Sequence, residues 1–193
     1  MDDRFGADRY EVEQLIRPLV NLYRISAVIP GVSEGQPVAF VRQKRMALKE
    51  DIRFFEDEEE SRELFRIKAR RMVDIGGRYD VTDPEGRRIG VLEKRFAKSL
   101  IRSTWRVLGA DEQEVAEAQE KSFLIAILRR VQDWVPLPYH FTIRAGGQEV
   151  GGVTRHFTFR DRYSLDLSGD TERAVDRRLG VAFAVGVDTL QDR

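Results

Sequence analysis

Apolar and polar residues alternate along most of the chain between residues 38 and 167. In LFRIKARR (64–71), Phe65 and Ile67 alternate with Arg66 and Lys68, which is the period-two pattern of a strand with one buried face. RYDVTDPEGRRIGVLEKRF (78–96) has such runs on both sides of Asp-Pro-Glu-Gly, a strong hairpin signal. Further strands or hairpins are predicted over residues 38–49, 51–55, 103–109, 139–153 and 155–167. Residues 114–121 fit a strand or a helix, and the acidic run EDEEES (56–61) fits a solvated turn.

A different spacing occurs near the N-terminus. YEVEQLIRPLVNLY (10–23) has apolar residues at helical spacing, and Asp8 with Glu11 has the spacing of a capping box. A short amphipathic helix is therefore predicted, with Pro18 kinking or dividing it. Residues 27–37, with two Pro and two Gly, are expected to form a linker. SFLIAILRRV (122–131) predicts a second short helix.

The C-terminal segment is apolar or Gly from Leu179 to Val187. Its alternation of large and small residues alone indicates a strand, but the charged approach SGDTERAVDRRL (168–179), with Asp170 or Thr171 as N-cap, favours a helix from about Thr171 to Leu190. Its second half is apolar all round, so such a helix must be enclosed on every side. Counted to Leu190, the apolar part spans roughly 18 Å, too short for a bilayer core of about 30 Å.

The number of predicted strands fits this enclosed helix. Roughly ten to twelve short strands suggest a sandwich or a closed barrel. A barrel of about eight strands holds only side chains, whereas a helix is roughly 10 Å wide. About eleven or more strands are needed to admit it, so we expect the apolar C-terminal segment to fill a barrel.

Composition narrows the function classes. The 193 residues include 33 Lys and Arg and 33 Asp and Glu, so no net charge favours nucleic acid or acidic lipid. Without Cys, disulfides, thiolate metal sites, palmitoylation and Cys nucleophiles are excluded. The charged start MDDRFGADRYEVEQ lacks the apolar run of a signal peptide, so a cytoplasmic location is expected.

Two stretches resemble a known family. GRYDVTDPEGRRIGVLEKRFAKSLIRSTWRVL (77–108) and YSLDLSGDTERAVDRRLGVAFAVGVDTL (163–190) resemble the LURP-one-related proteins, a branch of the tubby C-terminal-like superfamily that includes phospholipid scramblases. The resemblance covers approximately Val38 to Leu190. It implies a mainly β fold with helices (α+β), a closed barrel of about twelve strands enclosing the C-terminal helix. We therefore expect an N-terminal helix and linker over residues 1–37 and a barrel domain over 38–193.

The resemblance also implies functions. Its members are linked to lipid or phosphoinositide association, lipid scrambling and, in tubby proteins, transcription. Scramblases add a Pro-rich N-terminal region, palmitoylated Cys and a Ca²⁺ segment, and this chain has no Cys. In the corresponding segment Asp161 suits an EF-hand-like loop, but Tyr163 and Leu165 occupy the next ligand positions. Calcium binding is not expected.

The remaining candidates are weighed against simpler roles. Clustered cations can bind anionic lipid headgroups, and the candidates are Lys44, Arg45, Arg66, Lys68, Arg70 and Arg71. The simpler interpretation is a solvated face balanced by carboxylates. His140 and His156 are expected to be exposed without a shared metal, and Asp166 is expected to be half-buried in a structural role near the helix start. The Gly-rich AGGQEVGG (145–152) lies in a hairpin and fails as a P-loop.

We therefore expect a cytoplasmic, non-enzymatic binding or scaffold domain, peripheral to the inner face of the membrane through anionic lipid headgroups. The alternative is a scramblase-like lipid-handling protein. No hydrolase motif, cofactor motif or nucleic-acid recognition helix is present in the sequence pattern.

Overall fold

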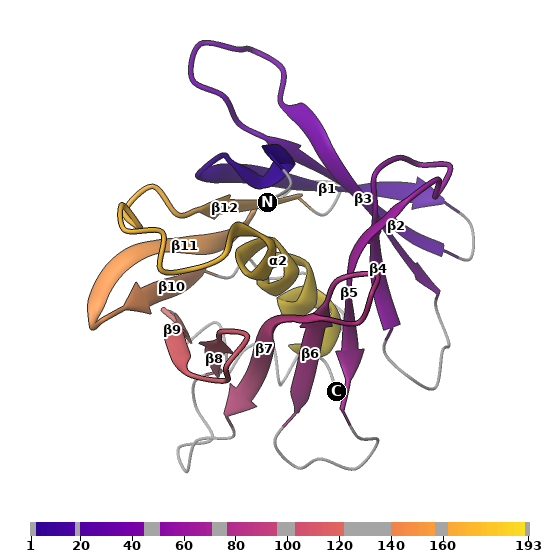
Figure 1. Cartoon of the computed structure of the whole chain (residues 1–193). Coiled ribbons are helices and arrows are strands. Elements are labelled where there is room, and N and C mark those ends of the chain that lie inside the picture. Colours follow the sequence, from indigo (N-terminus) through magenta and orange to yellow (C-terminus); the bar gives the residue numbers. More distant parts are fainter. Residues whose placement is uncertain are drawn as a thin grey trace, which may run out of the picture.

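Within the residues that the structure describes, twelve antiparallel strands form a closed barrel around a C-terminal helix (Figure 1). This computed structural model describes residues 3–17, 20–44, 51–70, 77–95, 103–121, 140–156 and 162–191. Strands adjacent in sequence are adjacent in the wall, and β1 pairs with β12 to close the ring. The predicted closed barrel with an enclosed helix is confirmed.

The elements have the following bounds. The strands are β1 (Arg9–Arg17), β2 (Val20–Ala27), β3 (Gln36–Lys44), β4 (Asp51–Phe55), β5 (Glu63–Ala69), β6 (Arg78–Thr82), β7 (Arg88–Arg95), β8 (Thr104–Leu108), β9 (Glu114–Glu120), β10 (His140–Ala145), β11 (Gln148–His156) and β12 (Arg162–Asp166). The helices are the 3-10 helix η1 (Asp3–Phe5) and the α-helix α2 (Arg177–Gln191). The open choice at residues 114–121 is resolved as strand β9, and the helix predicted over 122–131 lies outside the described residues.

The wall follows the alternation in the sequence. On β5, Phe65 and Ile67 are fully buried, whereas Arg66 is half-buried and Lys68 is exposed. The hairpin predicted over 78–96 is confirmed as β6 and β7, and Gly86 in their turn has φ 82°. Successive side chains of a strand point to opposite faces of the wall. The inward-pointing set therefore forms one apolar core around α2.

The N-terminal helix predicted over residues 10–23 is wrong, because this stretch contributes to β1 and β2. Tyr10 and Val12 point into the core while Glu11 between them is exposed, so the period is two at the start of the stretch. The same inward alternation continues through Tyr23 and Ile25 to Ala27. Pairing of β1 with β12 and of β2 with β3 favours the strand period over the helical period, because the barrel closes only when β1 and β2 are both in place.

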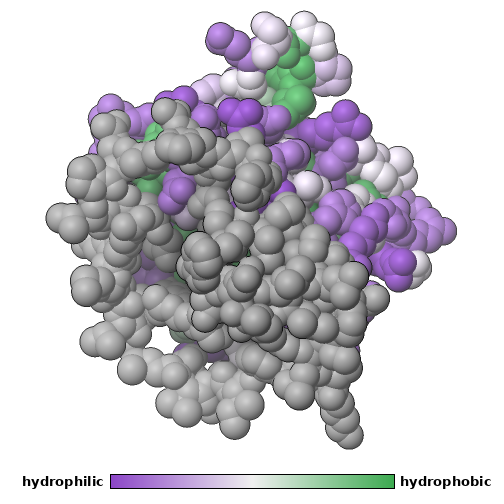
Figure 2. Space-filling model, turned by 180° about the vertical axis from the view of Figure 1, so that it is seen from behind, coloured by the Kyte–Doolittle hydropathy of each residue, from purple (hydrophilic) through white to green (hydrophobic). Residues whose placement is uncertain are grey.

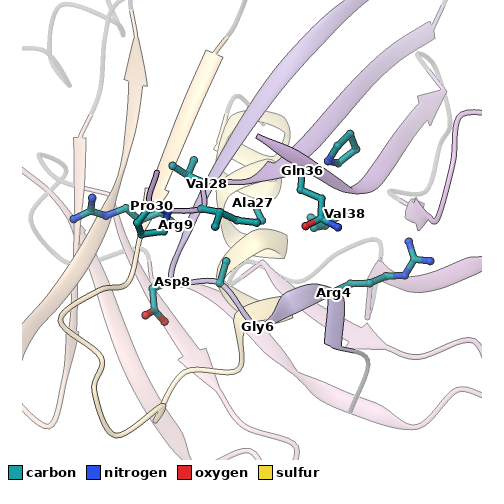
Figure 3. Close-up of a pocket in the computed structure, with 12 residues that line it drawn as sticks. Arg4, Gly6, Asp8, Arg9, Ala27, Val28, Pro30, Gln36 and Val38 are labelled. Atoms are coloured by element: carbon teal, nitrogen blue, oxygen red, sulfur yellow. The ribbon is translucent and has the colours of Figure 1, made fainter. Parts of the chain in front are cut away.

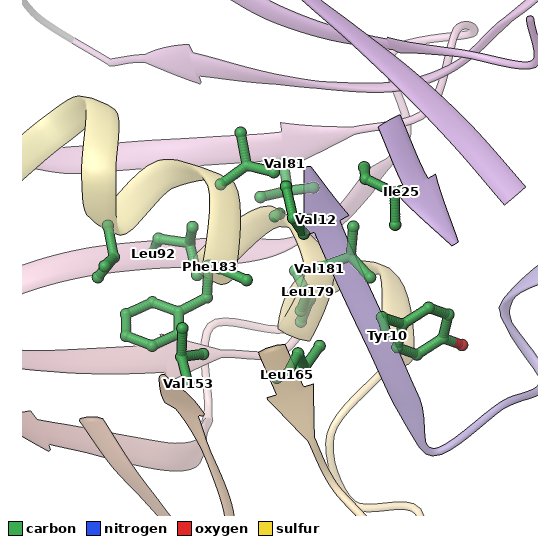
Figure 4. Close-up of a cluster of buried hydrophobic side chains, with 14 of the residues drawn as sticks. Tyr10, Val12, Ile25, Val81, Leu92, Val153, Leu165, Leu179, Val181 and Phe183 are labelled. Atoms are coloured by element: carbon green, nitrogen blue, oxygen red, sulfur yellow. The ribbon is translucent and has the colours of Figure 1, made fainter. Parts of the chain in front are cut away.

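Helix α2 fills the barrel, and all nine residues from 179 to 187 are buried. Figure 4 shows Leu179, Val181 and Phe183 of α2 among side chains from strands on different sides of the wall. The ring of Phe183 meets Trp105 and Phe141 edge-on, with centroids 6.1 and 5.7 Å away. An all-round apolar helix is stable here because β-structure surrounds it.

The helix begins at Arg177, later than the predicted Thr171. Asp176 is its N-cap: its Oδ1 accepts a hydrogen bond from the Arg178 amide at 2.9 Å, and its carbonyl accepts one from the Gly180 amide at 3.1 Å. Arg173 has φ 54°, a left-handed conformation that interrupts any helix started at Thr171. The predicted cap Asp170 instead accepts bonds from the Ala174 and Val175 amides within the preceding turn.

Glycines allow the wall and the helix to approach closely. A Cβ on Gly90 of β7 would lie 2.4 Å from the Leu108 carbonyl oxygen and 2.6 Å from Leu179 Cδ1. A Cβ on Gly180 of α2 would lie 2.8 Å from Leu167 Cδ1. Even a methyl group would therefore force helix and wall apart.

One end of the barrel is formed by the connections β2–β3, β4–β5, β6–β7, β8–β9 and β10–β11, and α2 begins at this end. We call it the α2 mouth. The Leu167 amide donates to the Asp8 carbonyl at 2.8 Å, and the Gly169 amide donates to the Val150 carbonyl at 3.1 Å. These bonds tie the approach to α2 onto the rim.

Replacing Phe183 by Ala tests whether α2 is the core of the barrel. We expect the free energy of unfolding to fall by about 3–5 kcal/mol, because the neighbouring rings would line a cavity. Urea unfolding followed by tryptophan fluorescence measures the change. Val32→Ala is the matched control, since Val32 is 54% exposed and should change stability by less than about 0.5 kcal/mol. Equal effects of the two substitutions would contradict the enclosed helix.

Candidate functional site

The basic row predicted on β5 lies on the outer wall, and carboxylates neutralise two of its described members. Arg66 Nε donates to Glu63 at 2.5 Å, and Arg70 Nε donates to Asp80 at 2.9 Å. Lys68 is exposed. Arg45 and Arg71 lie outside the described residues, as does the side chain of Lys44 at the end of β3. Whether the row binds headgroups stays a prediction.

Arg70 belongs to a tighter group, which we call the arginine cluster: Arg70, Arg78 and Arg88. All three donate to one carboxylate, that of Glu112 in the β8–β9 connection. Glu112 Oε1 accepts from Arg70 at 2.6 Å and from Arg88 at 2.8 Å, and Oε2 accepts from Arg78 at 2.7 Å. Arg70 directly follows β5, Arg78 begins β6 and Arg88 begins β7, so three neighbouring parts of the wall converge on one hairpin turn.

This geometry changes the acidity of both partners. Hydrogen bonds from Arg70 and then Arg78 outweigh the opposing effect of desolvation and lower the pKa of Glu112 to about 2. Hydrogen bonds to Asp80 and Glu112 raise the pKa of Arg70 above its already high ordinary value. Both shifts favour the charged forms of Glu112 and Arg70, so this ion pair is stabilised at neutral pH.

The β2–β3 connection carries a second feature. Val28, Ile29 and Val32 are the large apolar side chains that are exposed within the described part of the chain, at 37, 38 and 54%. Pro30 and Gly31 form the turn between them, and Gly31 has φ 83°. The connection projects beyond the wall in Figure 1, and Figure 2 shows hydrophobic (green) atoms in the projection at the top, next to coloured atoms that are mostly hydrophilic. We call residues 28–32 the apolar tip.

A pocket of about 750 Å³ lies at the base of the apolar tip (Figure 3). The hairpin lines it with apolar groups, among them Ala27, Val28 and Val38. The segment from η1 to β1 contributes charged groups, including Arg4 and Arg9. Both arginines are paired, Arg4 with Glu56 and Arg9 with Asp166. The pocket thus has an apolar wall facing a neutralised polar one.

A buried ion group holds the start of α2 to the N-terminal segment. Arg177 is 4% exposed and donates to Asp170 Oδ2 and to Asp8 Oδ1, each at 2.6 Å. Burial alone would raise the pKa of Asp170, but hydrogen bonds from the Val175 amide, Arg177 and the Ala174 amide lower it below its usual value. Asp8 is therefore an ion-pair partner in place of the helix cap that was predicted for it.

The other sequence candidates have local partners. His156 is exposed as expected and bonds Ser164 Oγ, whereas His140 is half-buried and bonds Thr154 Oγ1 at 2.7 Å. Burial and then Lys121 lower the pKa of His140. Asp166 is half-buried as predicted, but it accepts from the Ser168 amide beyond β12 and not near the start of α2. In the described residues, no three histidine or carboxylate side chains are grouped so as to hold a metal ion.

Three parts of these sites were not predicted from the sequence: Glu112, the pair of Arg177 with Asp170, and the apolar tip. The pairs of Glu112 join residues 24 to 42 positions apart, so only the wall order brings them together. The tip had a readable signal, since Pro-Gly stands between apolar residues in AVIPGVSEGQP. That stretch connects β2 to β3 and is not an interdomain linker.

These features define the class of protein: a closed antiparallel barrel whose interior is filled by its own C-terminal helix. The arginine cluster and the apolar tip both lie on its outer surface. The family model described as LURP-one-related matches residues 38–188, more than three quarters of the 193 residues. The chain belongs to the LURP-one-related family. No curated protein matches it. Among the described helices, none combines the length and apolarity needed to cross a membrane.

Replacing Asp170 by Asn tests the buried ion group. At pH 7 we expect a loss of about 3 kcal/mol in the free energy of unfolding, because Arg177 would keep only Asp8 as a carboxylate partner. The folded pKa of Asp170 lies below its unfolded value. Its contribution is therefore complete above the unfolded pKa and is lost as the pH falls through the folded pKa.

Denaturant unfolding of wild type and Asp170→Asn between pH 7 and pH 2 measures this. The difference between the two proteins should shrink as the pH falls below about 4. Arg9→Gln is the control, since it removes a surface pair and should cost less than about 1 kcal/mol. A difference that is independent of pH would contradict the assignment.

Proposed function

We propose that this LURP-one-related protein is a non-enzymatic binding domain that associates peripherally with a lipid bilayer through the apolar tip. It acts, on this proposal, at the cytoplasmic face of a membrane. The observation that carries the proposal is the exposure of Val28, Ile29 and Val32 together on one projecting connection.

The filled interior supports an external site. Helix α2 occupies the space in which barrels of this size can hold a ligand, and its residues 179–187 are buried. A partner must therefore meet the outer wall or a mouth. On the described surface, the large apolar side chains exposed to water are those of the apolar tip, and exposed apolar groups of this kind mark contact sites.

The shape of the tip favours lipid. A convex apolar projection can insert into the interface of a bilayer, whereas a protein partner would need a groove of matching shape. Burying the exposed parts of the three side chains would contribute about 2–3 kcal/mol in total. That is less than a single lipid chain provides, and even such a chain binds only marginally and reversibly, so a second contact with headgroups completes the proposal.

Replacing Val28, Ile29 and Val32 together by Ser tests the tip. We expect the partition coefficient onto phosphatidylcholine vesicles, measured by flotation, to fall at least tenfold, because the apolar contribution is removed. Stability should remain near wild type, since the side chains are exposed. Binding should also change little between 0.1 and 0.5 M salt, since apolar burial is not screened.

The control variant in the same connection is Glu34→Gln, which keeps the apolar residues and should bind as wild type or more tightly. Wild-type flotation unaffected by the triple substitution would overturn the proposal, as would wild-type protein that never floats. A dithionite assay on the same vesicles tests the scramblase-like alternative. That alternative requires lipid transfer between leaflets, whereas this proposal requires binding alone.

Lys68 tests the basic row as the headgroup contact. It is the exposed described member of the row, and a cation near an anionic surface contributes about 1 kcal/mol. We expect Lys68→Glu to weaken binding to vesicles containing phosphatidylserine roughly tenfold and to leave binding to phosphatidylcholine unchanged. The effect should disappear at 0.5 M salt. Equal loss on both vesicles would remove the row from the proposal.

A further inference from the structure

The β8–β9 turn places Glu112 in a conformation that suits glycine. The Glu112 amide donates to the Gly109 carbonyl at 3.0 Å, and Glu112 has φ 64°. The β6–β7 turn has the same form, with the Gly86 amide bonded to the Asp83 carbonyl at 3.0 Å and Gly86 at φ 82°. A side chain in this left-handed region is strained, so Glu at position 112 persists because the surrounding contacts hold it.

Those contacts are the three guanidinium groups of the arginine cluster. The β4–β5 turn provides a comparison, because Glu60 occupies the same turn position at φ 62° and is paired with a single arginine, Arg42. Three donors around one carboxylate exceed what the turn alone requires. A carboxylate has two oxygens, whereas a phosphate monoester offers three terminal oxygens and nearly two negative charges.

The charges of the cluster match such a ligand when Glu112 is withdrawn. Arg70, Arg78 and Arg88 together with Lys68 give four positive charges. Asp80, which contacts Arg70 and Arg88, and Glu93, which contacts Arg78, give two negative charges. Glu93 also contacts Arg106, whose charge is balanced by Glu114 at 2.5 Å. Lys68 stands opposite Asp80 in the β5–β6 register. The remaining charge of plus two equals that of a phosphate monoester dianion in magnitude.

Glu112 can leave without disturbing the wall. It lies in the turn after β8, outside the β8–β9 ladder, which ends at the pair Leu108 with Glu114. Its side chain is 33% exposed, and those of the three arginines are 24 to 39% exposed. Solvent, and hence an external anion, reaches the group from the outside.

We propose that Arg70, Arg78 and Arg88 form a binding site for a phosphate monoester, and that Glu112 closes it as an internal competitor. Ligand binding then requires the Glu112 side chain to swing away, and the affinity of the wild type is reduced by that competition. The site is independent of the apolar tip, because the β2–β3 and β8–β9 connections lie six strands apart in the ring of twelve described strands.

Glu112→Gly tests the proposal, because it removes the competing carboxylate and introduces the residue that φ 64° favours. Isothermal titration with glycerol 3-phosphate should show at least tenfold tighter binding than wild type. Arg78→Gln added to Glu112→Gly should abolish that gain. Glu112→Gln, which keeps the side-chain size, should also bind more tightly than wild type and serves if the glycine variant is unstable.

The matched control is Glu60→Gly, which makes the same change in a turn with one arginine and should leave phosphate binding at the wild-type level. Affinity unchanged in both Glu112 variants would overturn the proposal, and so would an equal gain from Glu60→Gly. Flotation with phosphatidic acid vesicles then separates the two sources of the ligand. A gain on these vesicles indicates a lipid headgroup, and a gain confined to glycerol 3-phosphate indicates a soluble ester.

Discussion

Enclosure of an apolar helix by β-structure is the constraint on which the whole fold depends. Residues 179–187 are buried on every side, so the wall must be wide enough for a helix and must have no gap. The family match begins at residue 38, but β1 and β2 precede it and close the ring by pairing with β12 and β3. Without them, two strand edges and one flank of α2 would face water. Strands β1 and β2 are thus as necessary to the core as the strands of the matched region.

A filled interior leaves the outer surface for any partner, and the chain's positive and negative side chains are equal in number. The chain has 33 of each, and the described wall arranges many of them as pairs. The predicted basic row illustrates this, because Arg66 and Arg70 both have carboxylate partners. Features that depart from this balance are therefore informative. The apolar tip has no polar cover, and Glu112 has three cations where one would suffice.

Much of the fold was readable from period and turn chemistry, and the failures have physical causes. The enclosed tail and the 78–96 hairpin were predicted because all-round apolarity and Asp-Pro-Glu-Gly each permit few structures. Residues 10–23 fit two periods, and the strand pattern becomes clear only when it is followed to Ala27, into the supposed linker. The site was less accessible. Ion pairs across three wall segments depend on register, and the exposure of Val32 depends on how far a hairpin projects.

The acidic turn between β4 and β5 shows how the ion pairs shape the surface beside the tip. Residues 56–60 carry five carboxylates, which alone would repel an anionic bilayer close to β3. Four arginines pair with this run: Arg4 and Arg62 with Glu56, Arg24 with Glu58 and Arg42 with Glu60. These four arginines pair with three of the five carboxylates, and the nine groups together carry a net charge of minus one. The acidic run is therefore more than a solvated turn, since arginines from η1, β2, β3 and the β4–β5 connection itself offset most of its charge at the α2 mouth. On the proposed function, apolar contact with a bilayer can dominate there, because the remaining charge neither repels nor attracts the bilayer strongly.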